Sequence, residues 1–511
     1  MSHWVVMPIV VPALLAALMV LTMRHHPALQ RTFSVGGIIA VLFIAIGLNV
    51  SAGTGAIHVY ELGDWPAPFG IVLVVDRLSA LMVLLTTLLA LAVALYVIGT
   101  GWDRRGRHFH ALLQFQIMGI IGAFLTGDAF NLFVFFEVLL IASYGLIIHS
   151  GGTARLRAGV QYVVYNLLGS TLFLFALGTL YAVTGTLNMA DLAERIAALP
   201  AEETALVRVG ATLLLLVFAV KAAILPLHFW LPGSYANAPA PVAALFAIMT
   251  KVGAYAIIRI YSLVFPPSLV ATQGLFDIWL MPAALLTLTV GMIGVLGSVR
   301  LERLVAFAVV GSMGTLLVAV ATLTEQATAA ALYYIVHSTF ASAALFLILD
   351  LTVERRPEGG RIAVAPPIAQ NGLIAGLFFA AAIALAGMPP LSGFLGKLLV
   401  LDAARAAERT WLIWTVILAT SLLAIVGFAR AGSTLYWKSA AVMPAAGAAV
   451  ADPPPAVRPA ALPFVSVGGI MTLLVAATVF AGPLTDYFAA IAAQIYTPAN
   501  YIEAVLGARA S

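Results

Sequence analysis

About fourteen apolar stretches, each long enough for a membrane-spanning helix, follow one another along the 511-residue chain. A helix needs about 20 apolar residues to cross a bilayer, and these stretches lack the alternation of polar and apolar residues that is typical of membrane β-barrels. Hydrophobic residues make up 63% of the chain and charged residues only 9%, which leaves no sizeable soluble domain. The sequence therefore predicts an all-α polytopic membrane protein. Its expected spans are residues 4–22, 32–50, 72–98, 111–126, 129–148, 160–183, 207–225, 240–264, 277–298, 303–323, 327–350, 368–388, 411–431 and 463–482.

Several kinds of chemistry are excluded by what the sequence lacks. The chain has no cysteine, which excludes thiolate-held iron–sulfur clusters, c-type haem attachment and disulfides. It also has no GxxxxGK[ST], HExxH or GxSxG motif, so it carries no phosphate-binding loop of the ATPase kind and no signature of those hydrolases. The net charge of +4 is spread thinly between apolar segments, and we expect no nucleic-acid binding. We therefore expect no enzyme activity, cofactor or metal. We expect the energy for transport to come from an ion gradient or from a partner subunit.

The charged loops predict the orientation in the membrane. Fourteen Lys and Arg residues, from Arg24 to Arg458, fall in loops on one side, and five, from Arg195 to Arg509, fall on the other. The positive-inside rule makes the first side cytoplasmic, and an even number of spans puts both termini outside. The first 23 residues lack a basic start and a small-residue cleavage site, so we expect a retained helix rather than a signal peptide.

Proline interrupts the apolar pattern at membrane depth in two places, KAAILPLHFWLPGSYANAPAPV (221–242) and GMPPLSGFLGKLL (387–399). Proline breaks a helix, and unpaired backbone inside a membrane is tolerated only within protein or beside water, as in transporters with paired broken helices. Each break contains a lysine, so we predict two copies of a five-helix unit. The predicted divisions are 1–110 (helices 1–3), 111–264 (first repeat, helices 4–8), 277–431 (second repeat, helices 9–13), 432–462 (flexible cytoplasmic linker) and 463–511 (helix 14 and a tail).

Three of the four lysines, Lys221, Lys251 and Lys397, lie inside the predicted spans or their breaks. A buried lysine loses the solvation of its charged form, whereas a nearby carboxylate stabilises that form, so such a residue can load and release a proton. Arginine stays protonated and cannot do this. A single such lysine is also explained by its ammonium reaching the interface or by a static ion pair. Three together favour proton transfer.

Glu137 is the only acidic residue in the interior of its span and needs a partner or a proton, because an unpaired charge at mid-membrane is costly. Lys221 is the candidate partner, and a permanently protonated structural Glu137 is the alternative. His228 in the first break and His337 in the span 327–350 are proton-relay candidates, although one hydrogen bond would also satisfy either ring. Asp128 starts its span as a helix cap, with an ion-binding role as the second possibility.

Four segments resemble a known family: TGDAFNLFVFFEVLLIASYGL (126–146), VKAAILPLHFWLPGSYANAPAPVAALFAIMTKVGAY (220–255), YYIVH (333–337) and GMPPLSGFLGK (387–397). They are similar to the antiporter-like proton-translocating subunits shared by respiratory complex I and multisubunit cation/proton antiporters. Within that superfamily the chain most resembles the D subunit of Mrp-type (Pha-type) Na⁺(K⁺)/H⁺ antiporters. Lys397 stands where one complex I homologue carries Glu, and the chain ends soon after the fourteenth expected span, unlike the large A subunit.

The resemblance implies fourteen helices with two inverted five-helix repeats, in which helices 7 and 12 are broken. By position, it implies that Glu137 and Lys221 form an ion pair, that Lys251 and Lys397 are relay lysines, and that His228 and His337 are the family's histidines. Many relatives place a further lysine about four residues after the second histidine, where this chain has Ala341. We therefore expect His337, Tyr333, Tyr334 and water to connect the half-channels.

The function that follows is proton translocation in a hetero-oligomeric Na⁺ or K⁺/H⁺ antiporter of the bacterial inner membrane, with the lipid bilayer and other subunits as partners. The first alternative is an antiporter-like proton-pumping subunit of a complex I-type quinone oxidoreductase or a membrane-bound hydrogenase. A self-sufficient solute permease is the second, and a structural scaffold the third. A scaffold leaves the three intramembrane lysines unexplained.

Overall fold

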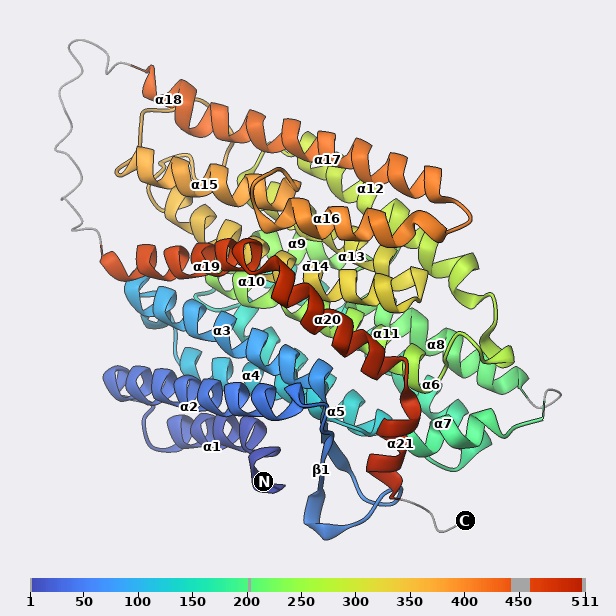
Figure 1. Cartoon of the computed structure of the whole chain (residues 1–511). Coiled ribbons are helices and arrows are strands. Elements are labelled where there is room, and N and C mark those ends of the chain that lie inside the picture. Colours follow the sequence, from blue (N-terminus) through green and yellow to red (C-terminus); the bar gives the residue numbers. More distant parts are fainter. Residues whose placement is uncertain (1, 201–203, 443–459, 508–511) are drawn as a thin grey trace.

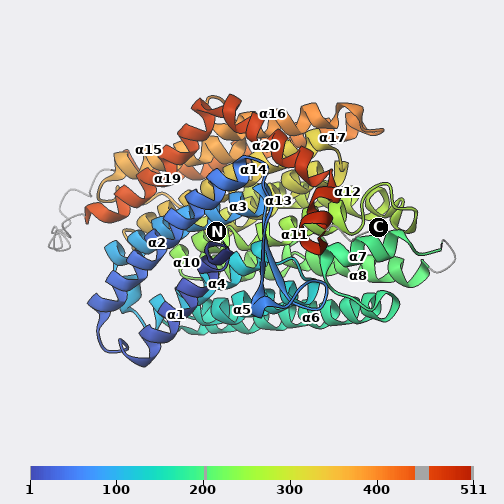
Figure 2. The same ribbon diagram turned by 60° about the horizontal axis from the view of Figure 1, so that its bottom comes forward.

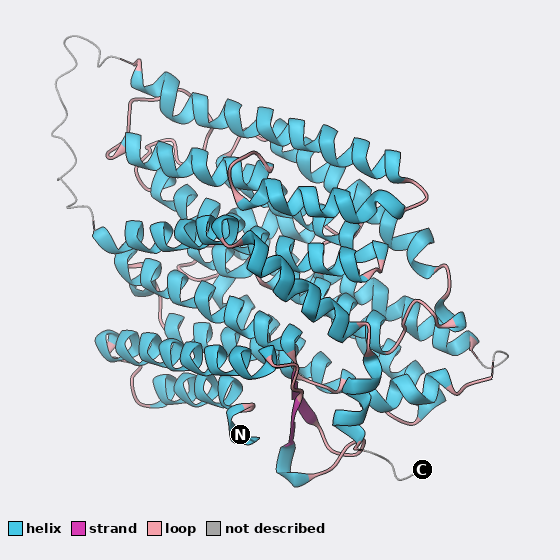
Figure 3. Cartoon of the chain, viewed as in Figure 1, coloured by secondary structure: helices cyan, strands magenta, loops and turns pink. Residues whose placement is uncertain are grey.

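The computed structural model describes residues 2–200, 204–442 and 460–507, which form a bundle of long helices (Figures 1 and 3). Ten helices in this part of the chain are long and apolar enough to cross a membrane, and α1, α4 and α15 are apolar but shorter. The prediction of a helical multi-span membrane protein is confirmed. α8 (Ala205–Lys221), which covers the remaining expected span, ends at the lysine of the first break.

The N-terminal part contains three long helices and a small β-hairpin. β1 pairs antiparallel with β2, with His58 opposite Val75 and Glu61 opposite Val72. The elements are η1 (Ser2–Trp4), α1 (Met7–Leu21), α2 (Pro27–Gly53), β1 (His58–Glu61), η2 (Leu62–Asp64), β2 (Val72–Val75), α3 (Arg77–Thr100) and η3 (Trp102–Arg104).

The hairpin corrects the expected span 72–98, because residues 72–75 form β2 and the helix begins only at Arg77. Asp76 defines this start. Its carboxylate accepts a hydrogen bond from the backbone N–H of Ser79 (2.8 Å), and the Ser79 hydroxyl accepts one from the N–H of Asp76 (3.0 Å). This reciprocal capping box satisfies backbone donors that a helix end leaves free. Hydrophobicity alone did not reveal the boundary because β2 is as apolar and as buried as the helix that follows.

The middle of the chain contains the first predicted repeat. Its break is visible as a gap between α8 and α9, and α10 and α11 together make the next span, residues 240–263. The elements are α4 (Phe109–Leu125), α5 (Ala129–Ile147), α6 (Thr153–Thr184), α7 (Met189–Ala197), α8, α9 (Trp230–Asn237), α10 (Ala240–Phe246) and α11 (Met249–Leu263).

The second predicted repeat follows, with its break between α15 and α16. Its elements are η5 (Val270–Thr272), η6 (Phe276–Leu280), α12 (Met281–Gly297), α13 (Leu301–Thr322), α14 (Glu325–Val353), α15 (Asn371–Ala386), α16 (Ser392–Ala403), η7 (Ala404–Ala406), α17 (Thr410–Gly432), η8 (Ser433–Trp437) and α18 (Lys438–Ala440). α14 lies in the middle of the bundle, between α6 on one edge and α17 on the other (Figure 2).

The expected linker 432–462 begins later than predicted, because the helix of α17 continues through η8 and α18 to Ala440. Proline first interrupts this sequence at Pro444, which explains the continuation. Residues 443–459 of the expected linker lie outside the described residues.

The C-terminal segment returns to the N-terminal part of the bundle. It forms α19 (Ala461–Val479), α20 (Ala481–Ile495) and α21 (Pro498–Leu506), so the tail over 484–508, whose structure the sequence left open, is mostly helical. α19 packs along α3, α20 packs along α14, and α21 contacts both β1 and α7 (Figure 1). The two ends of the chain therefore cover one side of the core together.

Candidate functional site

Lys221 is the last residue of α8, at the start of the first break. Its side chain is buried, and its Nζ lies 3.5 Å from the carbonyl oxygen of Asn166 and 3.5 Å from the hydroxyl of Ser170, both on α6. The helix stops here because Ala223 takes a left-handed backbone conformation (φ 55°) and Pro226 has no N–H to continue the ladder. The break therefore places the buried Lys221 side chain beside polar groups of α6.

Ser170 connects Lys221 with Glu137 of α5. The Ser170 hydroxyl donates a hydrogen bond to Glu137 Oε1 and lies beside the Lys221 ammonium. No ion pair of 4 Å or less joins Glu137 and Lys221 in this structure, although the carboxylate is close enough to act electrostatically on the lysine. The expected direct pair is thus replaced by a serine-bridged arrangement. The sequence contained a weak signal for it, a hydroxyl residue inside the apolar run NLLGSTLFLF.

Lys251 lies on α11 and is fully buried. Its Nζ has no hydrogen-bond partner among the residues that the structure describes. A Cβ atom added to Gly253 would lie 2.8 Å from the backbone N of Ala222, so only glycine allows α11 to pack directly on the residue that follows Lys221. A buried ammonium without a partner needs water or the loss of its proton, so this position favours proton release.

The second break holds Lys397, one turn inside α16. Its Nζ donates hydrogen bonds to the carbonyl oxygen of Ala386 (2.7 Å) and to the hydroxyl of Ser421 (2.8 Å). Ala386 ends α15, and the break leaves its carbonyl available. Gly387 adopts a left-handed conformation (φ 80°), and a Cβ there would lie 2.6 Å from Lys397 Cδ. Each break thus brings a lysine to polar groups at a helix end or on a neighbouring helix.

His337 lies on α14, close to the start of α16. Its Nδ1 is 2.9 Å from the hydroxyl of Ser392, the first residue of α16, and its Nε2 has no partner within the described parts of the chain. α14 packs against α16, which carries Lys397, and contacts α11, which carries Lys251. The structure therefore brings together three sequence-predicted residues, one from each of α11, α14 and α16.

The remaining candidates lie in different surroundings. The Tyr333 hydroxyl donates to the carbonyl oxygen of Ala477 on α19 (2.9 Å), and the buried Tyr334 packs against the His337 ring.

His228 is buried in the first break with its ring against Phe229. Asp128 caps α5 by accepting a hydrogen bond from the N–H of Asn131 (2.7 Å), and burial raises the pKa of this carboxyl to about 6. The cap is the role that the sequence favoured.

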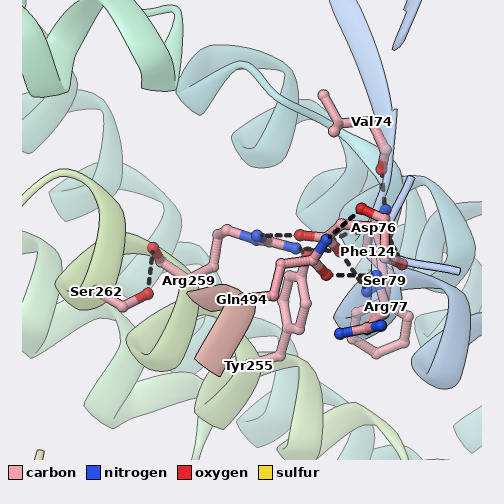
Figure 4. Close-up of polar contacts among 10 residues, drawn as sticks. Val74, Asp76, Arg77, Ser79, Phe124, Tyr255, Arg259, Ser262 and Gln494 are labelled. Carbon is pink, nitrogen blue, oxygen red and sulfur yellow. Dashed lines mark hydrogen bonds and ion pairs between the residues drawn. The ribbon is translucent and has the colours of Figure 1, made fainter. Parts of the chain in front are cut away.

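A buried ion pair was not assigned from the sequence. Arg259 of α11 donates two hydrogen bonds to the Asp76 carboxylate (2.6 and 2.8 Å) and lies beside the Tyr255 ring (Figure 4). Burial alone would raise the pKa of Asp76, but the charge and hydrogen bonds of Arg259 and the N–H of Ser79 lower it. The two partners are 183 residues apart, so no local pattern could have paired them.

The site consists of buried lysines and a histidine with few fixed partners. None of the three lysines forms an ion pair of 4 Å or less in the part of the chain that the structure describes. The same part contains no group of three or more His, Asp or Glu residues suited to a metal ion. Groups of this kind can accept a proton from one neighbour and pass it to another.

A bundle of long apolar helices with lysines buried at two helix breaks defines a polytopic membrane protein. The chain belongs to the family described as NADH:quinone oxidoreductase/Mrp antiporter, TM, which matches residues 126–423.

Relatives match nearly the whole chain. It is 38% identical to the probable K(+)/H(+) antiporter D subunit of Rhizobium meliloti strain 1021, over 99% of this chain and 98% of that protein. It is 39% identical to the Na(+)/H(+) antiporter D subunit of Bacillus subtilis strain 168, over 86% and 87%. A chain in the structure of the Mrp complex from Dietzia sp. DQ12-45-1b superimposes with a TM-score of 0.88 at 28% identity, over 99% of this chain and 100% of that chain. The resemblance inferred from the sequence is confirmed.

Proposed function

We propose that this chain is the proton-translocating subunit of a multisubunit Na⁺ or K⁺/H⁺ antiporter, a transporter rather than an enzyme. The names of the relatives support this class of function. The observation that carries the proposal is the series Lys221, Lys251, His337 and Lys397, which runs from the break of one repeat to the break of the other through buried positions.

The proton path in this proposal follows the contacts of the four residues. A proton held at Lys221 is stabilised by Glu137 through Ser170, and it moves to Lys251, whose helix packs against the break. His337, whose helix contacts those of Lys251 and Lys397, then passes it to Lys397. When Glu137 and Ser170 move away from Lys221, the protonated lysine loses its compensation and its proton is driven onward. His228 and Tyr334 line the path as secondary polar groups, and Asp128 remains a cap.

The topology in this proposal has fourteen spans, with α4–α11 and α12–α17 as inverted repeats and both termini outside. The asymmetric distribution of loop arginines supports the orientation, and the two lysine-bearing breaks support the repeats. The chain then resides in a bacterial inner membrane, beside the other subunits of a hetero-oligomeric complex. A redox-driven pump subunit is the second candidate, because the family description covers NADH:quinone oxidoreductases as well.

Everted vesicles that contain the complete complex test the proposal. After energisation, the interior pH is followed with a quenched dye while Na⁺ or K⁺ is added. We expect cation-dependent dequenching that Glu137→Ala and Lys221→Ala abolish with assembly intact. Lys438→Ala is the matched control, because this fourth lysine is exposed at the end of the α17 helix.

Near-normal transport in both site variants would contradict the relay. If instead no cation moves protons, but NADH or another reductant drives acidification that requires Lys221, the redox-pump alternative is correct.

A further inference from the structure

A polar cavity of about 460 Å³ lies at one end of α14, away from the lysine breaks. Five regions of the chain surround it: the residues after α3, the start of α6, the junction of α9 and α10, the start of α13 and the end of α14. Its charged lining residues are Arg105, Arg155, Glu302, Asp350 and Glu354. A space of this size and polarity holds a cluster of water molecules.

Asp350 is the innermost charged group of this cavity. Its side chain is only 3% exposed, and its Oδ2 accepts hydrogen bonds from the Tyr96 hydroxyl (2.9 Å) and the Trp102 indole N–H (2.9 Å). No cationic nitrogen lies within 4 Å of it in residues 2–200, 204–442 and 460–507, and no hydrogen bond there reaches Oδ1. One carboxylate oxygen is therefore left for water in the cavity.

The cations near Asp350 are engaged elsewhere. Arg105 pairs with Glu354 and stacks on the Trp102 ring, with its guanidinium carbon 3.9 Å from the ring centroid. Arg155 donates to backbone oxygens of the turn between α5 and α6 and to Asn237. Glu302 pairs with Arg300. A buried carboxylate whose charge is not neutralised by an ion pair has a reason to take up a proton.

Glu354 lies one helical turn beyond Asp350, with 28% of its side chain exposed. The two carboxylates are thus arranged in order from the surface to the interior. Glu354 and Glu302 are ion-paired with arginines, whereas Asp350 has no such pair in the described chain, so Asp350 is the lining carboxylate that is suited to exchange a proton with cavity water.

The cavity also lies at the ends of the helices that carry the relay. At 1.5 Å per residue, Asp350 is about 20 Å along α14 from His337, and Ala240, which lines the cavity, is about 16 Å from Lys251. Arg105 and Arg155 belong to the loops of the arginine-rich side, the cytoplasmic side in the proposed orientation.

We propose that this cavity is the cytoplasmic opening of the proton path and that Asp350 is its innermost proton carrier, exchanging protons with the cytoplasmic side through cavity water. This inference rests on the proposed antiport function. It adds a cytoplasmic opening to the path and a carboxylate that the sequence did not single out.

The test uses the complete complex in everted vesicles that are loaded with Na⁺ or K⁺ and diluted into cation-free medium at a range of pH. Cation efflux then draws protons inward from the cytoplasmic face, and dye quenching reports the exchange rate. Asp350→Asn is expected to slow exchange about tenfold or more at pH 9, where protons are scarce, with a smaller loss at pH 6.5, and Asp350→Glu is expected to restore it. Asp402→Asn is the matched control, since this partly exposed aspartate lies at the end of α16 outside the cavity.

A second measurement does not depend on removing the carboxylate. The chain has no cysteine, so Ala154→Cys places a single thiol in this chain at an exposed residue of the cavity lining. A methanethiosulfonate carrying a trimethylammonium group is expected to slow exchange several-fold, and one carrying a sulfonate is not. Vesicles with the unsubstituted chain control for thiols in the partner subunits.

Three results would overturn the inference. Wild-type rates for Asp350→Asn at every pH, or equal effects of the two reagents at verified labelling, would exclude a proton entrance while leaving the antiport function in place. A loss in Asp350→Asn that is independent of pH and not restored by Asp350→Glu would show a structural role. The proposed function fails separately, if the wild-type complex itself exchanges no cation for protons.

Discussion

The three buried lysines differ in the hydrogen-bond acceptors that surrounding residues offer to their ammonium groups. Lys397 donates two hydrogen bonds of normal length, Lys221 has two acceptors at 3.5 Å, and Lys251 has no acceptor in the described chain. A charge in the interior costs more when fewer polar groups compensate it. A proton is therefore expected to be held least firmly at Lys251, so that in the proposed path this residue serves for transit while the lysines at the breaks serve for storage.

Removing the Ser170 hydroxyl tests the bridge between Glu137 and Lys221. Hydrogen bonds to charged groups are worth about 1.5–3 kcal/mol, so Ser170→Ala is expected to lower the exchange rate about tenfold or more with assembly unchanged. The rate is measured by dye dequenching at several cation concentrations. Thr171→Val is the control, because the neighbouring hydroxyl is exposed and bonds only to the backbone of its own helix. Equal rates in the two variants would show that the bridge has no part in transport.

The sequence could predict every residue of the lysine series but not its polar partners. Lysine, glutamate and histidine stand out in an apolar span because burying them there is costly. Ser170, Ser392 and Ser421 do not stand out, since a serine in a membrane helix usually bonds to its own backbone. Only the packing of α6, α16 and α17 shows that these three hydroxyls contact Glu137, His337 and Lys397.

The second helix break depends on close packing at a glycine. A Cβ atom added to Gly393 would lie 1.8 Å from the carbonyl oxygen of Ala384 and 2.9 Å from His337 Cε1. The first turn of α16 therefore contacts both the end of α15 and the relay histidine directly. The two prolines before it place the break, and the glycine determines how near the new helix comes.

Gly393→Ala is expected to move α16 away from His337 and lengthen its hydrogen bond with Ser392. Overpacking of this kind costs about 1–3 kcal/mol, and exchange is expected to fall by about tenfold or more while the complex still assembles. Gly376→Ala, on α15 with no atom near the added Cβ, is the control. The thermal unfolding midpoint in detergent and the exchange rate are measured for both. Unchanged transport in the Gly393 variant would mean that this contact is dispensable.

Elements were predictable wherever the signal was local. The proline-rich runs located both breaks, and the apolar stretches located the long helices, although α6 begins seven residues before its expected span. The β-hairpin was missed, because β2 is an apolar run without polar alternation and merges with the stretch that forms α3. The helices α20 and α21 were left open, because packing against α14, α3, α7 and β1 contributes to their stability and is not visible in their own sequence.

Across the whole molecule, the Asp76–Arg259 pair joins regions that are distant in sequence. It connects the start of α3 with α11. The Tyr501 ring of α21 lies over the Arg259 guanidinium, and the guanidinium carbon is 5.3 Å from the ring centroid. Arg77 and Gln494 add contacts between α3 and α20 (Figure 4). The N-terminal part, the Lys251 helix and the C-terminal helices are thereby held together at one end of the bundle.

Asp76→Asn is expected to destabilise the chain by about 3–5 kcal/mol at neutral pH, because it leaves Arg259 buried without its partner. The pKa of Asp76 is lower in the folded chain than in the unfolded one. The stabilisation is therefore fully present above the unfolded value of about 3.9 and is lost as the pH falls through the lower folded value. Thermal unfolding midpoints of the wild type and the variant in detergent are expected to differ at pH 7 and to begin to converge as the pH falls below about 4.

Asp486→Asn, at an exposed position of α20, is the control for this comparison. A constant difference between the wild type and Asp76→Asn down to the lowest pH would show that the pair does not titrate as expected. No difference at pH 7 would show that the pair contributes nothing to stability.

The central position of α14 also bears on biosynthesis. This helix packs against α3, α10 and α13, which are made before it, and against α15, α16, α19 and α20, which are made after it. When α14 leaves the ribosome, about half of its final neighbours do not yet exist, and His337 and Asp350 would face lipid if it entered the bilayer alone. The helix must therefore be retained by the insertion machinery or by earlier helices until the last segments arrive. A nascent chain that stops before α19 is expected to leave uncovered the faces of α14 that pack against α19 and α20.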